Sequence, residues 1–308
     1  MPEPRATAQP EPFFLNLAGG PQGQRFAVHH APLGGPARAL VVYAHPFAEE
    51  MNKSRRMVAL QARALAAEGF AVLQMDLLGC GDSGGDFGDA SWAQWVDDVV
   101  HACHWLRQRH ARPEAQGLLP LWLWGLRAGC LLVTEAAAKL GEENCNFLFW
   151  QPTTAGSIAL QQFLRLKVAG DMLGGHGKGA MAALRQQLAS GHSIELAGYL
   201  LNPALATGLD RATLSLAAQK CRVEWLEVTP SNDGTLSPAS ARVANAWRLA
   251  GNQVHTQVVA GPAFWQTTEI EDAPELLAAT RAALLGNGAA RLAETAPMPG
   301  KALPEASA

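Results

Sequence analysis

Short runs of apolar residues alternate with longer stretches of helix-like pattern along most of this chain. Six runs are nearly continuous in hydrophobic residues, which is typical of strands buried on both faces: 39–44, 71–75, 119–124, 146–150, 223–228 and 253–259. Between them, residues 53–68 are amphipathic and end at Gly69, while 91–110 open with Ser91 as a helix cap. The alternation predicts an α/β fold with a mostly parallel central sheet flanked by helices.

The interval between the fourth and fifth predicted strands is too long for an ordinary crossover. It contains a helical pattern at 180–188 and a Gly-rich loop at 174–179. The loop lacks the spacing and the preceding strand of a phosphate-binding loop, so we interpret it as a hinge. We expect residues of about 152–220 to form a helical cap over the C-terminal edge of the sheet.

The two ends of the chain differ in composition from the rest. Residues 1–12 and 286–308 are rich in Pro, Ala, Gly or Glu and cannot bury enough apolar surface to offset the entropy of ordering. We therefore predict disordered tails at 1–12 and 286–308. A single domain then covers residues 13–285, and its cap is an insertion.

Composition narrows the classes of function. The 24 basic and 27 acidic residues give a net charge of −3, too balanced for a nucleic-acid surface. The five cysteines form no CxxC pair and no zinc-like spacing, which favours free thiols in a reducing cytoplasm. We find no secretory signal and no apolar run of about 18 residues, so we expect a cytoplasmic protein that does not span a membrane. No metal or cofactor signature is evident.

The segment most suggestive of chemistry follows the third predicted strand. Strand 119–124 runs into the pentapeptide Gly-Leu-Arg-Ala-Gly at 125–129, and an apolar helix follows at 130–140. In the G-x-S-x-G nucleophile elbow, glycines permit a tight strand-to-helix turn that lifts the central serine above the sheet. Here the central residue is Arg127. Because an arginine side chain has a pKa above about 12, it is neither nucleophile nor base, and acyl-enzyme chemistry by the usual route is not expected.

Two further segments fit the same fold. His-Pro-Phe at 45–47 stands where many α/β-hydrolases carry His-Gly after a strand. Since proline has no N–H, the backbone donors of an anion-binding site would be Phe47 and Ala128. The segment 76–83 has the form D-x-x-G-x-G-x-S, and we expect its role to be structural.

The remaining members of a catalytic triad are incomplete in the sequence. Asp233 follows strand 223–228, where the acid of a triad would stand. The histidine should follow the last strand, but residues 258–265 contain none, and His255 lies earlier, within that strand. Serine and histidine are thus both missing from their expected places.

At this point the sequence resembles a known family, the exosortase A system-associated α/β-hydrolases of the second type, over about residues 12–285. The segments that carry the resemblance are 45–55, 76–85, 125–129, 197–199 and 261–266, with Glu269-Ile270 nearby. The resemblance implies an α/β-hydrolase fold. It also implies a place in bacterial gene clusters for exopolysaccharide synthesis and for sorting of proteins with a C-terminal anchor signal. No triad is carried over, because the serine and histidine positions are not matched.

Arg127 allows two interpretations, which the sequence leaves open. Its guanidinium at the elbow, near a helix N-terminus, could hold a carboxylate or phosphate. Alternatively it is a buried arginine paired with Glu49, Glu50, Asp82 or Asp233, because a charge there must be paired.

Other residues near the elbow also allow a structural and a functional interpretation. For His45 we favour a loop histidine satisfied by backbone groups over a catalytic base, and Asp233 is better placed to neutralise a cation. Cys130 is expected to be packing, whereas Cys80 is expected to be more exposed. Trp265, beside the vacant histidine position, is a candidate stacking wall for a sugar or acyl chain.

Two functional hypotheses follow. In the first, the protein binds an anionic, acyl or sugar ligand, or a protein of the same system, through Arg127, Ala128, Phe47 and Trp265 without triad catalysis. In the second, it is an active hydrolase, an esterase, thioesterase or acyltransferase-like enzyme, in which His45 or Asp233 activates water beside Arg127. Fold alone does not decide between them.

Overall fold

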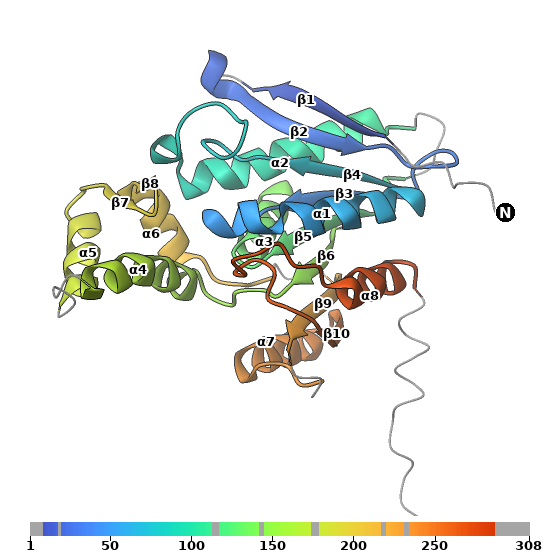
Figure 1. Ribbon diagram of the computed structural model, residues 1–308. Coiled ribbons are helices and arrows are strands. Elements are labelled where there is room, and N and C mark those ends of the chain that lie inside the picture. Colours follow the sequence, from blue (N-terminus) through green and yellow to red (C-terminus); the bar gives the residue numbers. More distant parts are fainter. Residues whose placement is uncertain are drawn as a thin grey trace, which may run out of the picture.

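The computed structural model describes residues 9–17, 20–112, 117–141, 145–173, 179–216, 220–230 and 234–286. These residues form an eight-stranded sheet in the order β1-β2-β4-β3-β5-β6-β9-β10 (Figure 1). β1 and β2 are antiparallel, and β2 pairs antiparallel with β4, while the strands from β4 to β10 run parallel to their neighbours. The strands are β1 Pro10–Asn16, β2 Gln24–His30, β3 Ala39–Ala44, β4 Phe70–Met75, β5 Leu121–Leu126, β6 Cys145–Trp150, β9 Arg222–Thr229 and β10 Gln253–Ala260.

All six strands predicted from apolar runs are present, shifted by at most a few residues. β1 and β2 are additional, and β1 begins at Pro10, within the segment 1–12 predicted as a tail. The composition of these residues is unfavourable for a core, but an edge strand gains backbone hydrogen bonds from its neighbour without being buried. Phe13 adds an aromatic stack on Trp105, with ring centroids 4.6 Å apart.

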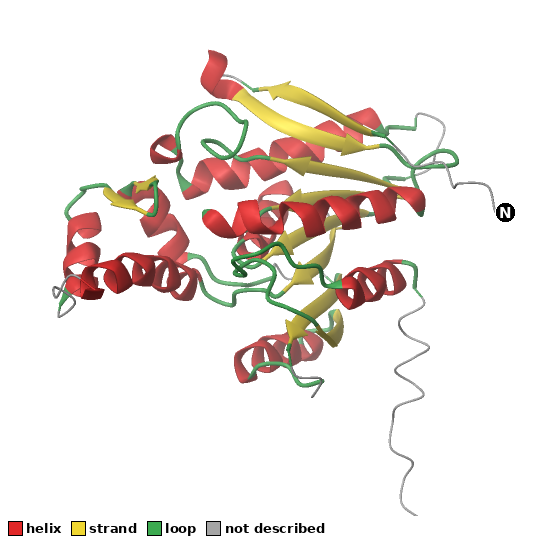
Figure 2. Cartoon of the chain, in the orientation of Figure 1, coloured by secondary structure: helices red, strands yellow, loops and turns green. Residues whose placement is uncertain are grey.

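Helices cover both faces of the sheet, as Figure 2 shows. One face packs against α1 Glu49–Ala67 and α8 Pro274–Leu284. The other packs against α2 Trp92–Arg109, α3 Gly129–Leu140 and α7 Pro238–Leu249. Ser91 caps α2 as the sequence predicts, accepting a hydrogen bond from the Gln94 N–H at 3.3 Å. Two short 3-10 helices, η1 Gly20–Gly23 and η2 Phe87–Asp89, lie in the connections.

The segment between β6 and β9 forms a separate group of elements, at the left of Figure 1. It consists of α4 Gly156–Leu173, α5 Ala180–Ala189, a hairpin of β7 Ile194–Leu196 and β8 Tyr199–Leu201, and α6 Pro203–Arg211. Close packing anchors it to the main domain, since a Cβ on Gly208 would lie 2.2 Å from the Cβ of Trp92. These elements occupy the residues that the sequence assigns to a cap. Of the predicted hinge loop, residues 174–178 lie outside the described part of the chain.

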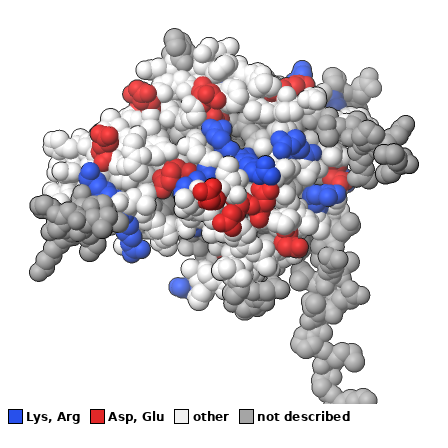
Figure 3. All heavy atoms as spheres, in the orientation of Figure 1, with Lys and Arg blue, Asp and Glu red and all other residues white. Residues whose placement is uncertain are grey.

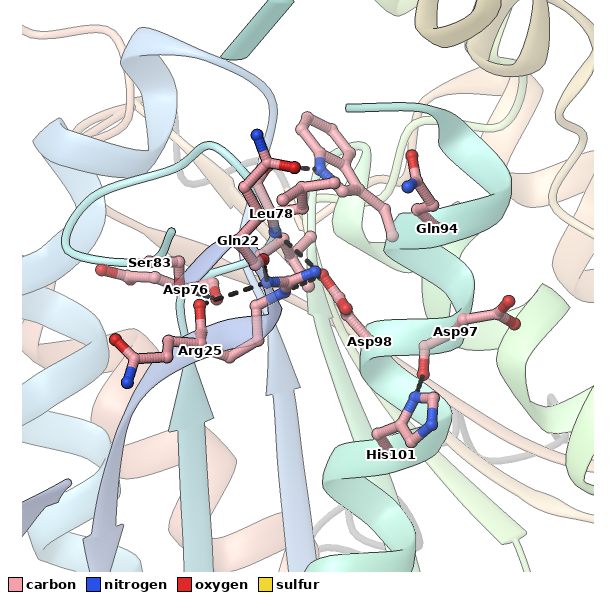
Figure 4. Close-up of polar contacts among 12 residues, drawn as sticks. Gln22, Arg25, Asp76, Leu78, Ser83, Gln94, Asp97, Asp98 and His101 are labelled. Atoms are coloured by element: carbon pink, nitrogen blue, oxygen red, sulfur yellow. Dashed lines mark hydrogen bonds and ion pairs between the residues drawn. The ribbon is translucent and has the colours of Figure 1, made fainter. Parts of the chain in front are cut away.

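A buried ion pair holds β2 to the turn after β4 and to α2 (Figure 4). Arg25 Nε lies 2.8 Å from Asp98 Oδ2, and that same oxygen accepts the Leu78 N–H at 2.8 Å. The Ser83 hydroxyl in turn accepts the Phe26 N–H at 2.9 Å. This network gives the segment 76–83 a structural role, because it ties β2 and the turn after β4 to α2.

None of the described helices is both long and apolar enough to cross a membrane. The five cysteines are all buried and free of disulfides. Cys80 differs from expectation, because only 6% of its surface is exposed and burial raises the pKa of its thiol. Cys130 is fully buried with its pKa raised by the same cause, so neither thiol is poised as a nucleophile.

Candidate functional site

The elbow, residues 125–129, makes the sharp turn from β5 into α3. Arg127 has φ of 55°, a left-handed conformation that costs a non-glycine residue about 1–3 kcal/mol. A Cβ on Gly125 would lie 2.6 Å from the backbone N of Cys130, and one on Gly129 would lie 2.2 Å from the carbonyl oxygen of Ala44. Both glycines are therefore required by close backbone approach. The turn has the geometry of a nucleophile elbow with arginine at its apex.

The Arg127 side chain contacts three different elements. Its Nε donates to Glu50 Oε1 in α1 at 3.3 Å, and its Nη2 donates to Gln162 Oε1 in α4 at 2.8 Å. The guanidinium carbon lies 5.6 Å from the ring centroid of Trp265, in the loop after β10. The side chain is 12% exposed. One acid, Glu50, thus takes one edge of the guanidinium, and the other contacts are neutral.

A pocket with a volume of about 330 Å3 opens beside this side chain, and we call it the Arg127 pocket. One part of its lining is apolar and the other is polar or charged. The apolar residues are Phe47, Ala159, Phe163, Leu166 and Trp265, and the others are Glu49, Glu50, Lys53, Arg127, Gln162 and Gln266.

Two buried polar atoms of this lining have no hydrogen-bond partner, Glu49 Oε2 and Trp265 Nε1. Buried polar groups are rarely left unpaired, and such atoms in a cavity point to a ligand or water that completes them. Burial raises the pKa of Glu50, and the nearby Arg127 charge and hydrogen bonds from Arg127 and Gln266 oppose that rise. Burial thus outweighs these opposing effects and leaves the pKa of Glu50 above its ordinary value.

The backbone N–H groups predicted as anion donors lie at the same edge. Phe47 lines the pocket, and Ala128 directly precedes the first turn of α3. Within the described part of the chain, no oxygen accepts a hydrogen bond from the N–H of Phe47 or from that of Ala128. Both donors are thus uncommitted, next to a helix N-terminus that favours negative charge.

His45 lies away from the pocket and is satisfied internally. Its Nδ1 lies 2.8 Å from the Pro46 carbonyl, and its Nε2 accepts the Leu77 N–H at 3.3 Å. Only 3% of the residue is exposed, and burial lowers its pKa. Both nitrogens of His45 are thus engaged by backbone groups, as expected from the interpretation that the sequence favours.

The structure places the other predicted site residues differently. Asp233 lies outside the described residues. Trp265 is 4% exposed and one face of its ring meets the guanidinium, so the expected stacking wall is largely used within the protein. Gln162 and Gln266 were missed, because a single glutamine in a helix or loop carries no sequence signal until the fold brings it to the elbow. No three described His, Cys, Asp or Glu residues are grouped to hold a metal ion.

Comparison with solved structures identifies the class of fold. Similar structures include an α/β serine hydrolase without lid from Xanthomonas campestris, at 16% identity and a TM-score of 0.53 over 94% of this chain and 98% of that chain. A highly thermostable carboxyl esterase from Bacillus coagulans has 14% identity and a TM-score of 0.58 over 90% of this chain and 98% of the esterase. A soluble variant of monoglyceride lipase from Saccharomyces cerevisiae has 13% identity and a TM-score of 0.55 over 92% and 96%. The chain has the α/β-hydrolase fold.

Sequence comparison gives a more local match. Residues 35–168, which include the elbow, match the family model named Serine aminopeptidase, S33. A curated relative, human protein ABHD12B, is 31% identical over 106 residues, which is 34% of this chain and 26% of the human protein. The match thus spans about a quarter of the relative's length. Within the matched region, arginine stands where the serine of a G-x-S-x-G elbow would stand.

Proposed function

We propose that this protein binds an amphipathic anion in the Arg127 pocket, through its carboxylate or phosphate, and does not form an acyl-enzyme. The observation that carries the proposal is the position of Arg127: a guanidinium at the apex of the elbow, lining a pocket of about 330 Å3. A planar fork of N–H donors suits a carboxylate or phosphate group. We therefore favour binding of an anion at the position where other proteins of this fold carry a nucleophile.

The lining supports an amphipathic ligand. Phe163 and Leu166 of α4 offer apolar surface for an acyl chain or the apolar face of a sugar. The N–H groups of Phe47 and Ala128 and the indole N–H of Trp265 have no acceptor among the described residues and can serve the anionic head. The ligand class is therefore an acyl or sugar acid.

Charge balance within the pocket sets a condition on binding. Glu49 and Glu50 offset Lys53 and Arg127, so an incoming anion must compete with Glu50 for the guanidinium. Because burial raises the pKa of Glu50, this carboxylate can take up a proton and release Arg127 to the ligand. Binding is thus expected to be accompanied by proton uptake.

The biological setting is proposed from the resemblance alone. The segments that resemble exosortase A system-associated hydrolases favour a cytoplasmic role in exopolysaccharide synthesis or protein sorting. In that setting the ligand is an acyl or sugar intermediate of the system, or an acidic segment of a partner protein.

Direct titration tests the proposal. Octanesulfonate combines a permanent negative charge with an apolar chain, and we expect it to bind the full chain saturably by calorimetry. Arg127→Gln should weaken binding at least about tenfold, a loss of about 1.4 kcal/mol. Arg56→Gln is the matched control, because Arg56 is exposed on α1, pairs with Asp272 and does not line the pocket. Unchanged affinity in Arg127→Gln would overturn the proposal.

Hydrolysis is the competing function, and one observation favours it: Glu50 is a buried carboxylate with a raised pKa beside uncommitted backbone donors. Short and long p-nitrophenyl esters with a fluorophosphonate probe separate the two functions. Turnover above background that is abolished by Glu50→Gln would establish hydrolysis. Saturable octanesulfonate binding without turnover or labelling supports the binding function.

A further inference from the structure

A second cavity lies between α1 and the sheet, and we call it the α1 cavity. Its volume is about 220 Å3, and it shares no lining residue with the Arg127 pocket. Its floor is the face of β2, β4 and β3 that α1 covers, where His30, Gln74 and Tyr43 stand on neighbouring strands. Val58 and Ala59 of α1 form part of its roof. In Figure 1, β2 and β1 continue the sheet on the side of β4 away from β3.

Two buried polar atoms in the lining, Tyr43 Oη and His30 Nδ1, make no hydrogen bond of good geometry to a described residue. Tyr43 is 7% exposed and His30 is 1% exposed. The Ser54 hydroxyl is a hydrogen-bonding neighbour of the Tyr43 hydroxyl and opposes the rise in its pKa, and it donates its own hydrogen bond to the Met51 carbonyl at 3.0 Å. Unpaired polar atoms cost free energy when buried, so two in one cavity point to a ligand or water that completes them.

A ligand that completes these two atoms must both donate and accept hydrogen bonds. Burial raises the pKa of Tyr43, so the phenol keeps its proton and donates. His30 Nε2 lies 2.6 Å from Gln74 Oε1, which can only accept, so the proton sits on Nε2. Burial lowers the pKa of His30, which leaves the ring neutral and Nδ1 a free acceptor. Hydroxyl groups meet both requirements, because each can donate and accept.

One positive charge at this cavity is not compensated. Arg55 pairs with Asp76 at 2.9 Å, whereas Arg63 forms no ion pair within the described ranges. Arg63 is exposed and lines the cavity at its rim. Figure 3 shows Lys and Arg side chains over the region of α1 on this face, with Asp and Glu side chains beside them. A ligand with a single negative charge would balance Arg63.

We propose that the α1 cavity binds a small polyhydroxylated monoanion, of the short sugar-acid type. Its hydroxyls meet Tyr43 and His30, and its carboxylate faces Arg63. The apolar side chains of Phe26, Val28 and Val58 pack against its carbon skeleton.

Calorimetric titration of the full chain with glycerate tests this site. Glycerol carries the hydroxyls without the charge, and propionate carries the charge without the hydroxyls. We expect saturable binding of glycerate, and affinities for glycerol and propionate that are each lower by about tenfold or more. Absence of saturable glycerate binding would overturn the proposal, as would equal affinity for all three compounds.

Variants assign the binding to this cavity. Arg63→Gln should lower glycerate affinity about tenfold and leave glycerol unaffected. Arg56→Gln, about two turns away on the exposed surface of α1, should change neither. Tyr43→Phe should weaken both ligands, with thermal unfolding confirming that it folds; if it does not fold, Arg63→Gln alone decides. Arg127→Gln should leave glycerate binding intact. Two results would place the ligand elsewhere and contradict the proposal: loss of glycerate binding in Arg127→Gln, or unchanged glycerate affinity in Arg63→Gln. Both results are independent of octanesulfonate binding.

Discussion

Two arginines of this protein, the buried Arg25 and the half-buried Arg127, pair with a carboxylate in different surroundings. Arg25 meets Asp98 at 2.8 Å, with side chains 7% and 3% exposed, and the same carboxylate also accepts a backbone N–H (Figure 4). Arg127 meets Glu50 at 3.3 Å, with side chains 12% and 17% exposed, beside a pocket with unpaired polar atoms. An arginine stabilises the fold when its carboxylate partner is buried and also accepts a backbone hydrogen bond. An arginine with a longer ion pair and a pocket beside it is available to a ligand.

The largest expected effect breaks the structural pair. Asp98→Ala leaves the Arg25 charge buried without its partner, so we expect the free energy of unfolding to fall by about 3–5 kcal/mol. Denaturant unfolding measures this loss. The neighbouring Asp97→Ala is the control: Asp97 pairs with Lys139 at the exposed surface, and its loss should cost less than about 1 kcal/mol. Equal losses in the two variants would contradict the comparison.

The next effect concerns the ligand-facing arginine. Arg127→Lys keeps the charge but loses the planar fork, so octanesulfonate should bind about three- to tenfold more weakly than to the natural chain. Its unfolding free energy should change by less than about 2 kcal/mol, because the guanidinium has one long ion pair to lose. A destabilisation as large as that of Asp98→Ala would make Arg127 a structural arginine like Arg25.

A smaller effect appears in the pH dependence of binding. Octanesulfonate does not titrate in the accessible range, so any change reports the protein. Because burial raises the pKa of Glu50 above its usual 4.5, this group gains a proton as pH falls toward that raised value, and affinity should increase. Glu50→Gln should bind more tightly at neutral pH and show no such increase. If this variant kept the pH dependence of the natural chain, protonation of Glu50 would not control ligand binding.

The same group affects stability with a definite sign. A folded-state pKa above the unfolded one means that the folded protein holds more protons, so stability falls as pH rises through that window. The unfolding free energy of the natural chain relative to Glu50→Gln should therefore decrease from acid toward neutral pH. Urea unfolding of both chains at several pH values measures the difference.

The smallest effect is expected when a serine replaces the arginine at the elbow, because esterase activity should not appear. Arg127→Ser recreates the G-x-S-x-G pattern, but no histidine follows β10 in residues 261–266 to act as base. We expect p-nitrophenyl ester turnover to stay at background. Substantial turnover would mean that another residue acts as base. Arg127→Ser combined with Ala263→His is the matched positive variant.

Much of the fold could be predicted from local patterns. Five of the six predicted strands, β3, β4, β5, β6 and β9, are mostly buried on both faces, and that signal survives without any knowledge of neighbours. The sixth, β10, is the other edge strand and is partly exposed. β1 could not be found this way, because an edge strand such as Pro10–Asn16 is held by backbone hydrogen bonds to β2 and buries little of its own surface.

The sequence by itself determined the elbow, since the glycines at 125 and 129 and their spacing belong to one continuous segment, and it determined that arginine occupies the apex. Only the tertiary structure decided what surrounds that arginine. Glu50, Gln162 and Trp265 come from three elements separated by many residues, and a single glutamate looks the same in sequence whether it pairs with Arg127 or faces solvent. Pairing, burial and cavity volume are properties of side chains brought together through space, so they follow from packing and not from the order of residues.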